Sequence, residues 1–423
     1  MSFSDSCSPD PSRPRQLRRR DLGGLAAAVA AAPVIGLAPD LPGAAARAAA
    51  PERLRLRRDP GSVVAALDVP LSSAAGTARS APGAAVRTAV LETDRFSMLG
   101  VTWGSGRGRI RVRTRGVAGG WSGWRVLPPL HDGPDGATAE AGTPPATEPV
   151  WVGPCSAVQV EVDGAVRRPV LALIDPGSLP QDASDGGRVA ARDGGTDPGD
   201  ATDTTDATDG TDGADTVAAE KKGVPQPKVR LRKAWGANPK LLSDGPGRIR
   251  TVKQVHVHHT VNSNGYKRRD VPALIRGMYR YHTKSLGWSD IGYNFLVDRF
   301  GRIWVGRKGS LKMAQGAHTL GFNSTSVGVS VIGNFETARP RKEVLAAIAR
   351  IAAWKLDAFD RDPTAKIRVR SSGSDKYRAG RRVKLPVIDG HRDTNDTACP
   401  GRHLYKKLPA IRRRTARRIK RFN

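Results

Sequence analysis

The sequence predicts an α/β domain in its C-terminal half, preceded by a small all-β, sandwich-like domain, and three observations support this. Between Phe96 and Asp175, short runs of alternating apolar and polar residues are separated by Gly, Pro or Asp, which is the pattern of a small β-sandwich or barrel. From residue 225 onward, apolar strands alternate with helical patterns. An acidic segment without aromatic residues lies between the two regions. A chain of 423 residues has room for two such domains and their linkers.

Residues 1–50 are predicted to be an export signal. A basic stretch with arginines at positions 18–20 precedes a weakly apolar run from Leu22 to Ala38, and Ala44–Ala50 supply small residues at the spacing that a signal peptidase accepts. The apolar run is too short and too interrupted by Gly and Pro for a membrane span, so we expect no transmembrane segment in the mature chain. The arginines resemble a twin-arginine signal, and an ordinary secretory signal with extra arginines is the alternative.

We place the all-β domain at residues 55–180 and call it the N-terminal module. Its tryptophans suit a carbohydrate platform, but in a small all-β domain they more often fill the core; they are Trp103, Trp121, Trp124 and Trp151. Loss of the export signal removes Cys7 and leaves Cys155 and Cys399. Two cysteines in a secreted chain suggest one disulfide by number, but these lie in different predicted domains. We therefore expect no such bond, and we expect Cys155 to be a packing residue.

Residues 181–224 are predicted to be a disordered acidic linker. Residues 181–220 hold eleven acidic residues, two arginines and no aromatic residue, which is too little apolar area to offset the entropy of ordering. The whole chain carries a formal charge of +29, and nineteen Lys or Arg against four Asp lie from Lys366 to the end. Such a basic chain attracts polyanions, namely nucleic acid, an anionic membrane surface or an anionic cell-wall polymer.

The C-terminal module, residues 225–423, is predicted to be mixed α/β. Residues 254–260 form a strand; residues 270–286 form a helix capped by Asp270 with Pro272 in its first turn. A hairpin turns near residues 299–301, and an apolar strand follows within 326–335. A second helix spans 342–359, a last strand lies within 385–390, and the basic tail is helical.

A catalytic zinc ion needs three protein ligands and an open fourth position, and imidazole and thiolate are suitable donors. His391 and Cys399 supply two donors from one polar loop that Pro400 and Gly401 close. The third donor has to come from elsewhere, and the strand "VHVHHT" offers candidates. His256 and His258 share one face of this strand, whereas His259 points the other way. Spacing alone leaves the choice between His256 and His258 open.

Four motifs resemble one family when they are taken together and in order. They are "VHVHHT", "GWSDIGYNFLVDRFGRIWVGR", "GAHTLGFNSTSVGVSVIGNF" and "GHRDTNDTACPG". Their order and spacing are similar to those of the peptidoglycan recognition protein family, whose catalytic members are zinc N-acetylmuramoyl-L-alanine amidases. The resemblance covers residues 228–415 and implies a mixed central sheet flanked by helices. It also implies that His258 is the third zinc ligand beside His391 and Cys399, and that His256 either has a structural role or supports a ligand from behind.

The resemblance also implies the remaining site residues. Tyr293 matches the catalytic tyrosine, whose hydroxyl stabilises the attacking water or the developing oxyanion, and Thr397 stands where relatives carry an assisting lysine or threonine. Ser330 occupies the position where some relatives carry a glutamate general base. The substrate groove corresponds to Trp288, His318 and Asn323. Arg392 and Asp393 either orient His391 or cap its loop.

The sequence therefore predicts a secreted, cell-wall-associated zinc amidase that cleaves the N-acetylmuramoyl-L-alanine amide of peptidoglycan. The alternative is a protein of the same family that recognises peptidoglycan without cleaving it, but such members typically lack the cysteine ligand, which is present here as Cys399. No nucleic-acid-binding motif is visible, and an export signal argues against a nucleic-acid partner. The basic tail is predicted to bind anionic wall polymers, and a solvated helix face is the alternative.

Overall fold

The computed structural model describes residues 53–71, 86–136, 142–187, 223–243 and 245–423. The predicted export signal and most of the predicted linker lie outside these ranges. All of the described residues belong to one structural unit, which spans Val34–Asn423. Within them, no helix has both the length and the hydrophobicity needed to cross a membrane.

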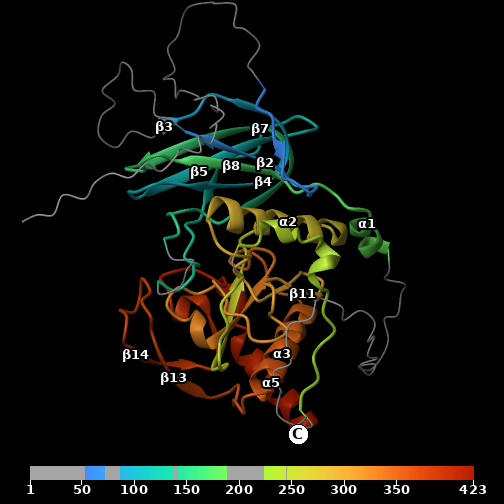
Figure 1. Cartoon of the computed structure of the whole chain (residues 1–423), viewed down its shortest axis with the longest axis vertical. Helices are drawn as coiled ribbons and strands as arrows, with labels where there is room; N and C mark the ends of the chain where they lie inside the picture. The colour runs from blue at the N-terminus through green and yellow to red at the C-terminus, as the bar shows by residue number, and fades with distance from the viewer. Residues whose placement is uncertain (1–52, 72–85, 137–141, 188–222, 244) are drawn as a thin grey trace, which may run out of the picture. The chain divides into compact units, whose positions relative to one another are not determined.

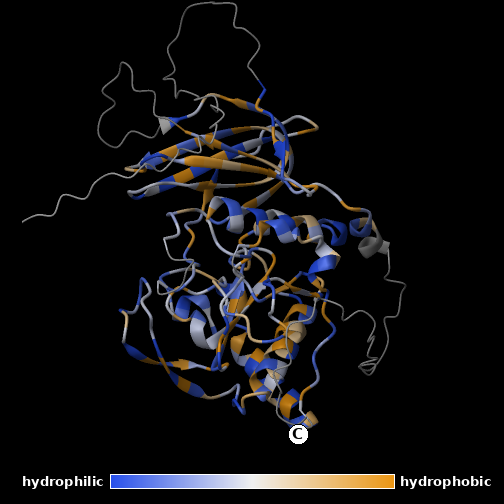
Figure 2. Cartoon of the chain, in the orientation of Figure 1, coloured by the Kyte–Doolittle hydropathy of each residue, from blue (hydrophilic) through white to orange (hydrophobic). Residues whose placement is uncertain are grey.

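The N-terminal module is all-β, as predicted, and its strands form one antiparallel sheet (Figure 1). The strand order is β1-β2-β8-β4-β7-β5-β6, and β3 pairs with β7 outside this path. The strands are β1 (Arg57–Arg58), β2 (Ala65–Pro70), β3 (Val86–Arg87), β4 (Leu91–Thr102), β5 (Gly108–Gly116), β6 (Arg125–Leu127), β7 (Val150–Gly164) and β8 (Val170–Asp175). Along them hydrophilic and hydrophobic segments alternate (Figure 2), as expected for strands whose two faces differ.

The four tryptophans of this module lie in different surroundings, and Trp151 is partly buried against the cluster that contains Met98 and Tyr281. Trp103 lies in the core of the module and is 7% exposed. Trp121 is 36% exposed, and the guanidinium carbon of Arg113 lies 5.0 Å from its ring centroid and 5.2 Å from that of Trp124. Core filling therefore accounts for Trp103 but not for the arginine-covered pair. Cys155 is buried and, like Cys399, free, as predicted.

Helix α1 (Pro180–Gly187) occupies the beginning of the segment predicted to be a disordered linker. Its Asp182 is buried and pairs with buried Arg276 in the C-terminal module, with Nη1 3.0 Å from Oδ1. A buried ion pair with further hydrogen bonds can order a segment of such composition. The composition could not reveal this contact, because the partner lies 94 residues away in the chain.

The C-terminal module is built on a mixed five-stranded sheet of order β11-β10-β12-β9-β15. Its strands are β9 (Gln254–His259), β10 (Phe295–Val297), β11 (Ile303–Val305), β12 (Ser326–Val331) and β15 (Ile388–Gly390). The β10–β11 hairpin is antiparallel, and every other pair is parallel. The sequence predicted these strands but not the separate hairpin of β13 (Lys366–Arg370) and β14 (Arg382–Pro386).

Among the described residues, four α-helices and one π-helical turn accompany the sheet: α2 (Val271–Arg280), the π-helical turn η4 (Tyr281–Ser285), α3 (Lys342–Asp357), α4 (Arg402–Tyr405) and α5 (Leu408–Phe422). Short 3-10 turns complete the module: η1 (Arg232–Trp235), η2 (Pro239–Leu241), η3 (Arg268–Asp270), η5 (Asn323–Thr325) and η6 (His391–Asp393). Pro272 stands in the first turn of α2, as predicted. The carboxylate of Asp270 accepts the backbone N–H of Lys267 at 2.7 Å, so it closes the preceding turn η3 rather than capping α2.

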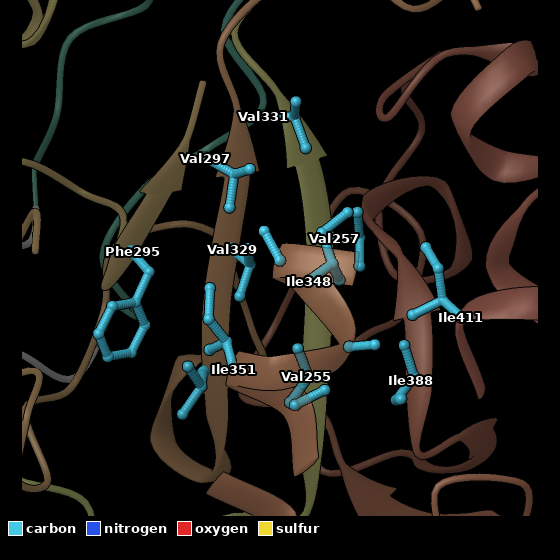
Figure 3. Packing of buried hydrophobic residues seen from close by; sticks show 14 of the residues in the cluster. Val255, Val257, Phe295, Val297, Val329, Val331, Ile348, Ile351, Ile388 and Ile411 are labelled. Atoms are coloured by element: carbon cyan, nitrogen blue, oxygen red, sulfur yellow. The ribbon is translucent and has the colours of Figure 1, made fainter. Parts of the chain in front are cut away.

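One face of this sheet packs against α3 and α5 (Figure 3). Alternate strand residues such as Val255, Val257 and Val329 contribute to this core, together with Ile348 and Ile411 from the helices. Because side chains alternate along a strand, His256, His258 and Ser330 fall on the opposite face. This face is also buried. The polar residues therefore lie on the face of the sheet that α3 and α5 do not cover.

The opposite face is covered in part by residues of the N-terminal module. One apolar cluster contains Met98 and Ile174 from that module and Met278 and Tyr281 from α2 and η4. A Cβ atom on Gly100 would lie 2.6 Å from the Tyr281 ring, so the strand carries glycine where the ring approaches. The Tyr281 hydroxyl donates to the carbonyl oxygen of Thr147 at 3.0 Å. The two modules therefore share one continuous core.

Candidate metal centre and groove

The three residues predicted as metal ligands, His258, His391 and Cys399, lie together, with their ligand atoms within 4.8 Å of one another. The Cys399 sulfur lies 3.9 Å from Nδ1 of His258. All three residues are buried. Two imidazoles and one thiol in a buried cluster match the donor set that zinc prefers, and these residues therefore fit a zinc ion.

Sheet register brings the two histidines together. Strand β15 runs parallel to β9 with Gly390 opposite Val257, so the next residue of each chain segment, His391 and His258, falls at the same level. Cys399 returns to this point because its carbonyl oxygen accepts the backbone N–H of Arg392 at 2.9 Å. The backbone N–H of His259 points at the sulfur from 3.3 Å and favours its thiolate form.

Burial and neighbouring charges set the protonation of the three residues. Burial, together with the neighbouring His391 and His318, holds the pKa of His258 well below its usual value, and burial does the same for His391. Both imidazoles are therefore neutral, which is the form that binds metal. Burial and nearby carboxylates raise the pKa of the Cys399 thiol, and a bound cation reverses this effect by deprotonating a coordinating thiol.

His318 lies behind the centre rather than in an open groove. It is fully buried, and its Nδ1 lies 3.2 Å from Nε2 of His258. A Cβ atom on Gly328 would approach the His318 ring to 2.2 Å, so β12 carries glycine where this ring packs on the sheet. A partner on the second nitrogen of a ligand histidine fixes the tautomer and orientation of its ring. The structure thus places His318 as a positioning residue for His258.

His256 has its partner outside the cluster of candidate ligands. Its Nδ1 bonds to Oδ1 of Asp389, and both side chains are fully buried. Asp393 accepts the backbone N–H of Gly390 at 2.9 Å and the Tyr405 hydroxyl at 2.6 Å, so it caps the loop rather than orienting His391.

Tyr293 lies beside the centre, with its ring centroid 5.6 Å from that of His258. Its hydroxyl donates to Oδ2 of Asp132 at 2.5 Å. Burial and the Asp132 carboxylate raise the pKa of Tyr293, so the phenol stays protonated and is a hydrogen-bond donor. Ser330 lies beside His258 in the sheet, and its buried Oγ finds no hydrogen-bond partner within the part of the chain that the structure describes.

Thr397 is half-buried in the cysteine loop, and its hydroxyl oxygen accepts the backbone N–H of Cys399 at 3.2 Å. This contact gives Thr397 a role in shaping the loop. A direct role in the chemistry stays a prediction.

Trp288 and Asn323, the other predicted groove residues, both contact the segment between β6 and β7. The indole N–H of Trp288 donates to Oγ1 of Thr143 at 2.8 Å. The side-chain amide of Asn323 donates to the carbonyl oxygen of Gly133 and to Oδ1 of Asp135, both at 2.8 Å. Both residues are buried, so the predicted groove is covered in this structure.

Asp132 is the residue of this site that the sequence did not indicate. Its Oδ1 lies 3.2 Å from Nδ1 of His391 and 3.6 Å from Nδ1 of His258. The sequence around it, "LHDGPDG", has the composition of an ordinary turn. Asp132 is 161 residues from Tyr293 in the chain, and no local pattern predicts a contact over that separation.

Comparison with known proteins finds two family models that match separate parts of the chain. A model described as Rv3811 N-terminal galactose-binding domain-like matches residues 55–212, and one for N-acetylmuramoyl-L-alanine amidase matches residues 248–402. Peptidoglycan-recognition protein SC1a of Drosophila melanogaster is 31% identical over 174 residues, 41% of this chain and 80% of that protein. Peptidoglycan-recognition protein SA of the same species is 32% identical over 127 residues, 30% and 60% of the two chains.

The solved structure of wild-type Drosophila PGRP-LB covers 43% of this chain and 93% of its own, with 28% identity and a TM-score of 0.35. The sequence relationship, the amidase model and the shared motifs lead to one assignment. The chain belongs to the peptidoglycan recognition protein family, within the type 2 amidase group.

Proposed function

We propose that the protein is a zinc-dependent amidase that hydrolyses the bond between N-acetylmuramic acid and the L-alanine of the stem peptide. The observation that carries this proposal is the complete ligand set His258, His391 and Cys399, converging within 4.8 Å. A protein that only recognises peptidoglycan has no need of three buried, converging metal ligands.

A bound zinc ion would polarise the scissile carbonyl and supply hydroxide at neutral pH. The residues of the chain have separate tasks. His318 holds the ring of His258 from behind, at 3.2 Å, and the backbone N–H of His259 holds the Cys399 sulfur. The Tyr293 hydroxyl, a protonated donor beside the centre, is placed to stabilise negative charge on the carbonyl oxygen.

Ser330 in place of a glutamate leaves less capacity for proton transfer within β12. The protonated Tyr293 hydroxyl beside His258 then carries more of the proton transfer.

The proposed location is outside the cell and on the wall. The predicted export signal supports it, and so does the name of the relatives, which are peptidoglycan-recognition proteins. The proposed partners are peptidoglycan and, through basic helix α5, anionic wall polymers.

The test is digestion of purified peptidoglycan by the full chain, with and without a chelator, followed by mass spectrometry. The expected product is free stem peptide with a new L-alanine amino terminus, formed only when metal is present. Retention on peptidoglycan without any such product, in the wild-type chain and in a variant whose site has been opened, would favour the recognition protein instead.

A further inference from the structure

We propose that Asp132 is a fourth ligand of the zinc ion, donated by the N-terminal module, and that it keeps the amidase latent. The inference rests on the proposed function, because it concerns the same metal. It involves the segment between β6 and β7, of which residues 128–136 and 142–149 are described; we call these residues the covering segment.

The first argument is the spacing of the donor atoms. With Zn–N bonds of about 2.0–2.1 Å and Zn–S bonds of about 2.3 Å, neighbouring donors in a tetrahedral site lie about 3.3–3.7 Å apart. Oδ1 of Asp132 lies 3.2 and 3.6 Å from Nδ1 of His391 and of His258. The distance from the latter nitrogen to the Cys399 sulfur is 3.9 Å. Oδ1 of Asp132 is thus close to ligand spacing from both histidine nitrogens, on the histidine side of the cluster.

The second argument is that this oxygen has no other partner. Oδ1 of Asp132 is buried and accepts no hydrogen bond among the described residues. Burial of a carboxylate oxygen is unfavourable unless a donor or a cation compensates it. A cation held by His258, His391 and Cys399 supplies that compensation.

The third argument is that the other oxygen of the same carboxylate is also engaged. Oδ2 of Asp132 accepts the hydroxyl of Tyr293 at 2.5 Å. The Asp132 side chain therefore takes the coordination position that a water molecule would need. It also engages the Tyr293 hydroxyl that would stabilise the oxyanion. Zinc with four protein ligands has the closed arrangement of a structural site, whereas catalysis needs one open position.

The covering segment is held in place by buried hydrogen bonds. Oδ1 of Asp135 accepts the backbone N–H of Gly321 and the side-chain amide of Asn323, both at 2.8 Å. Thr143 accepts the indole N–H of Trp288, and Thr147 accepts the hydroxyl of Tyr281. Two of these partners, Trp288 and Asn323, are the residues predicted to bind substrate. Peptidoglycan can reach them only after the covering segment has moved.

The inference is tested on the full-length chain loaded with Co²⁺, whose visible spectrum reports the ligands around the metal. The probe is acetohydroxamate, which binds a metal only where a coordination position is open. The wild-type spectrum should be insensitive to it, while Asp132→Ala should bind it at least tenfold more tightly. The same variant should hold zinc at least tenfold more weakly in competition with a chelator, and should release stem peptide at least tenfold faster.

Two further variants guard against misfolding and against a purely steric effect. Asp132→Asn keeps the shape and the contact with Tyr293 but replaces a carboxylate by a neutral amide, a poor zinc ligand, so it should also open the site to the probe. Asp135→Ala loosens the covering segment without touching the metal, and an intermediate gain in probe affinity is expected. The control is Asp163→Ala, which removes an exposed acid of the same module and should behave as the wild type does.

A wild-type Co²⁺ protein that binds acetohydroxamate as tightly as Asp132→Ala would overturn the inference. A chain that binds neither Co²⁺ nor Zn²⁺ would overturn the metal centre and the inference with it. If Asp132→Ala opens the site to the probe but releases no stem peptide, the assignment of Asp132 stands and the proposed amidase activity is wrong.

Discussion

His256 and His258 lie two positions apart on the same face of β9, yet they have different partners. His256 bonds to Asp389, whereas His258 faces Cys399 with one nitrogen and His318 with the other. The chemistry of each imidazole therefore depends on what the neighbouring strands place beside it. In the sequence the two are equivalent, and only the resemblance to a family separated them.

The first prediction follows from this difference. His258→Ala should abolish stoichiometric zinc binding, because it removes a ligand. His256→Ala should keep close to one zinc per chain but lower the melting temperature, because Asp389 is left buried without its partner. Metal content by mass spectrometry and thermal unfolding of both variants decide the matter. Loss of zinc in His256→Ala alone would show that the ligand on β9 was assigned two residues too late.

At the scale of elements, β4 connects the two modules through a close contact. A Cβ atom on Gly100 would lie 2.6 Å from the ring of Tyr281, which is fully buried. Gly100→Ala should therefore destabilise the chain by about 1–3 kcal/mol, the usual effect of overpacking. Urea denaturation measures the change. In the control Gly123→Ala the new methyl group meets nothing within 4 Å, and equal destabilisation of both variants would contradict the contact.

Helix α3 contains a buried lysine whose pKa gives stability a pH dependence. The Nζ atom of Lys355 donates to the carbonyl oxygens of Leu311 and Lys312 and lies 4.0 Å from the centroid of the Trp354 ring. Burial lowers the pKa of Lys355 from 10.5 to about 7. Between these values the unfolded chain binds more protons than the folded chain, so the free energy of unfolding rises with pH and is reduced again as pH falls toward 7.

The third prediction compares the wild type with Lys355→Met. Between pH 7 and pH 9 the free energy of unfolding of the wild type should rise by about 1–3 kcal/mol relative to the variant. The two carbonyl oxygens lose their donor in the variant at every pH, so the change with pH is the informative quantity. Urea denaturation at several pH values measures it. Parallel curves for the two proteins would mean that Lys355 keeps an ordinary pKa in the folded state.

The sequence predicted most of the elements but not all of their contacts. Strands β9, β10 and β12 and helices α2 and α3 follow local patterns of apolar residues, and a local pattern is sufficient because each element buries one face. The candidate metal ligands could be proposed because His391 and Cys399 share a short loop. Asp132 could not be found, since it reaches the centre from another module. The role of His318 could not be found either, because it depends on the space above Gly328.

At the scale of the whole molecule, the positive charge is concentrated at the C-terminal end. Helix α5 buries Leu408, Ile411 and Thr415 against the C-terminal module, so the basic tail is part of the fold. Its outer side carries exposed cations at Arg413, Arg417 and Lys420. Substitution of these three residues tests their charge and leaves the buried face of α5 in place. Truncation after Leu408 would remove that face.

The fourth prediction concerns binding to intact cell walls. Replacement of Arg413, Arg417 and Lys420 by Gln should weaken retention at low salt, and the difference from the wild type should vanish near 1 M salt, where the Debye length is about 3 Å. A matched control changes exposed basic residues of the N-terminal module to Gln, namely Arg107, Arg109 and Arg125. Sedimentation with purified walls measures retention. An equal loss in both variants would mean that net charge matters and the position of α5 does not.

The Tyr281 hydroxyl donates to the carbonyl oxygen of Thr147, and the Asp132 carboxylate lies beside the two histidines, so the two modules meet around the candidate metal centre. Thermodynamic linkage is reciprocal. A molecule that binds the N-terminal module and moves Asp132 away from the centre must raise the affinity for substrate, and substrate must raise the affinity for that molecule by the same factor. Removal of the metal would likewise destabilise the N-terminal module, at positions far from His258, His391 and Cys399. A wall component recognised by the first module would therefore act as the effector of the second, and would confine hydrolysis to the surface where both ligands are found.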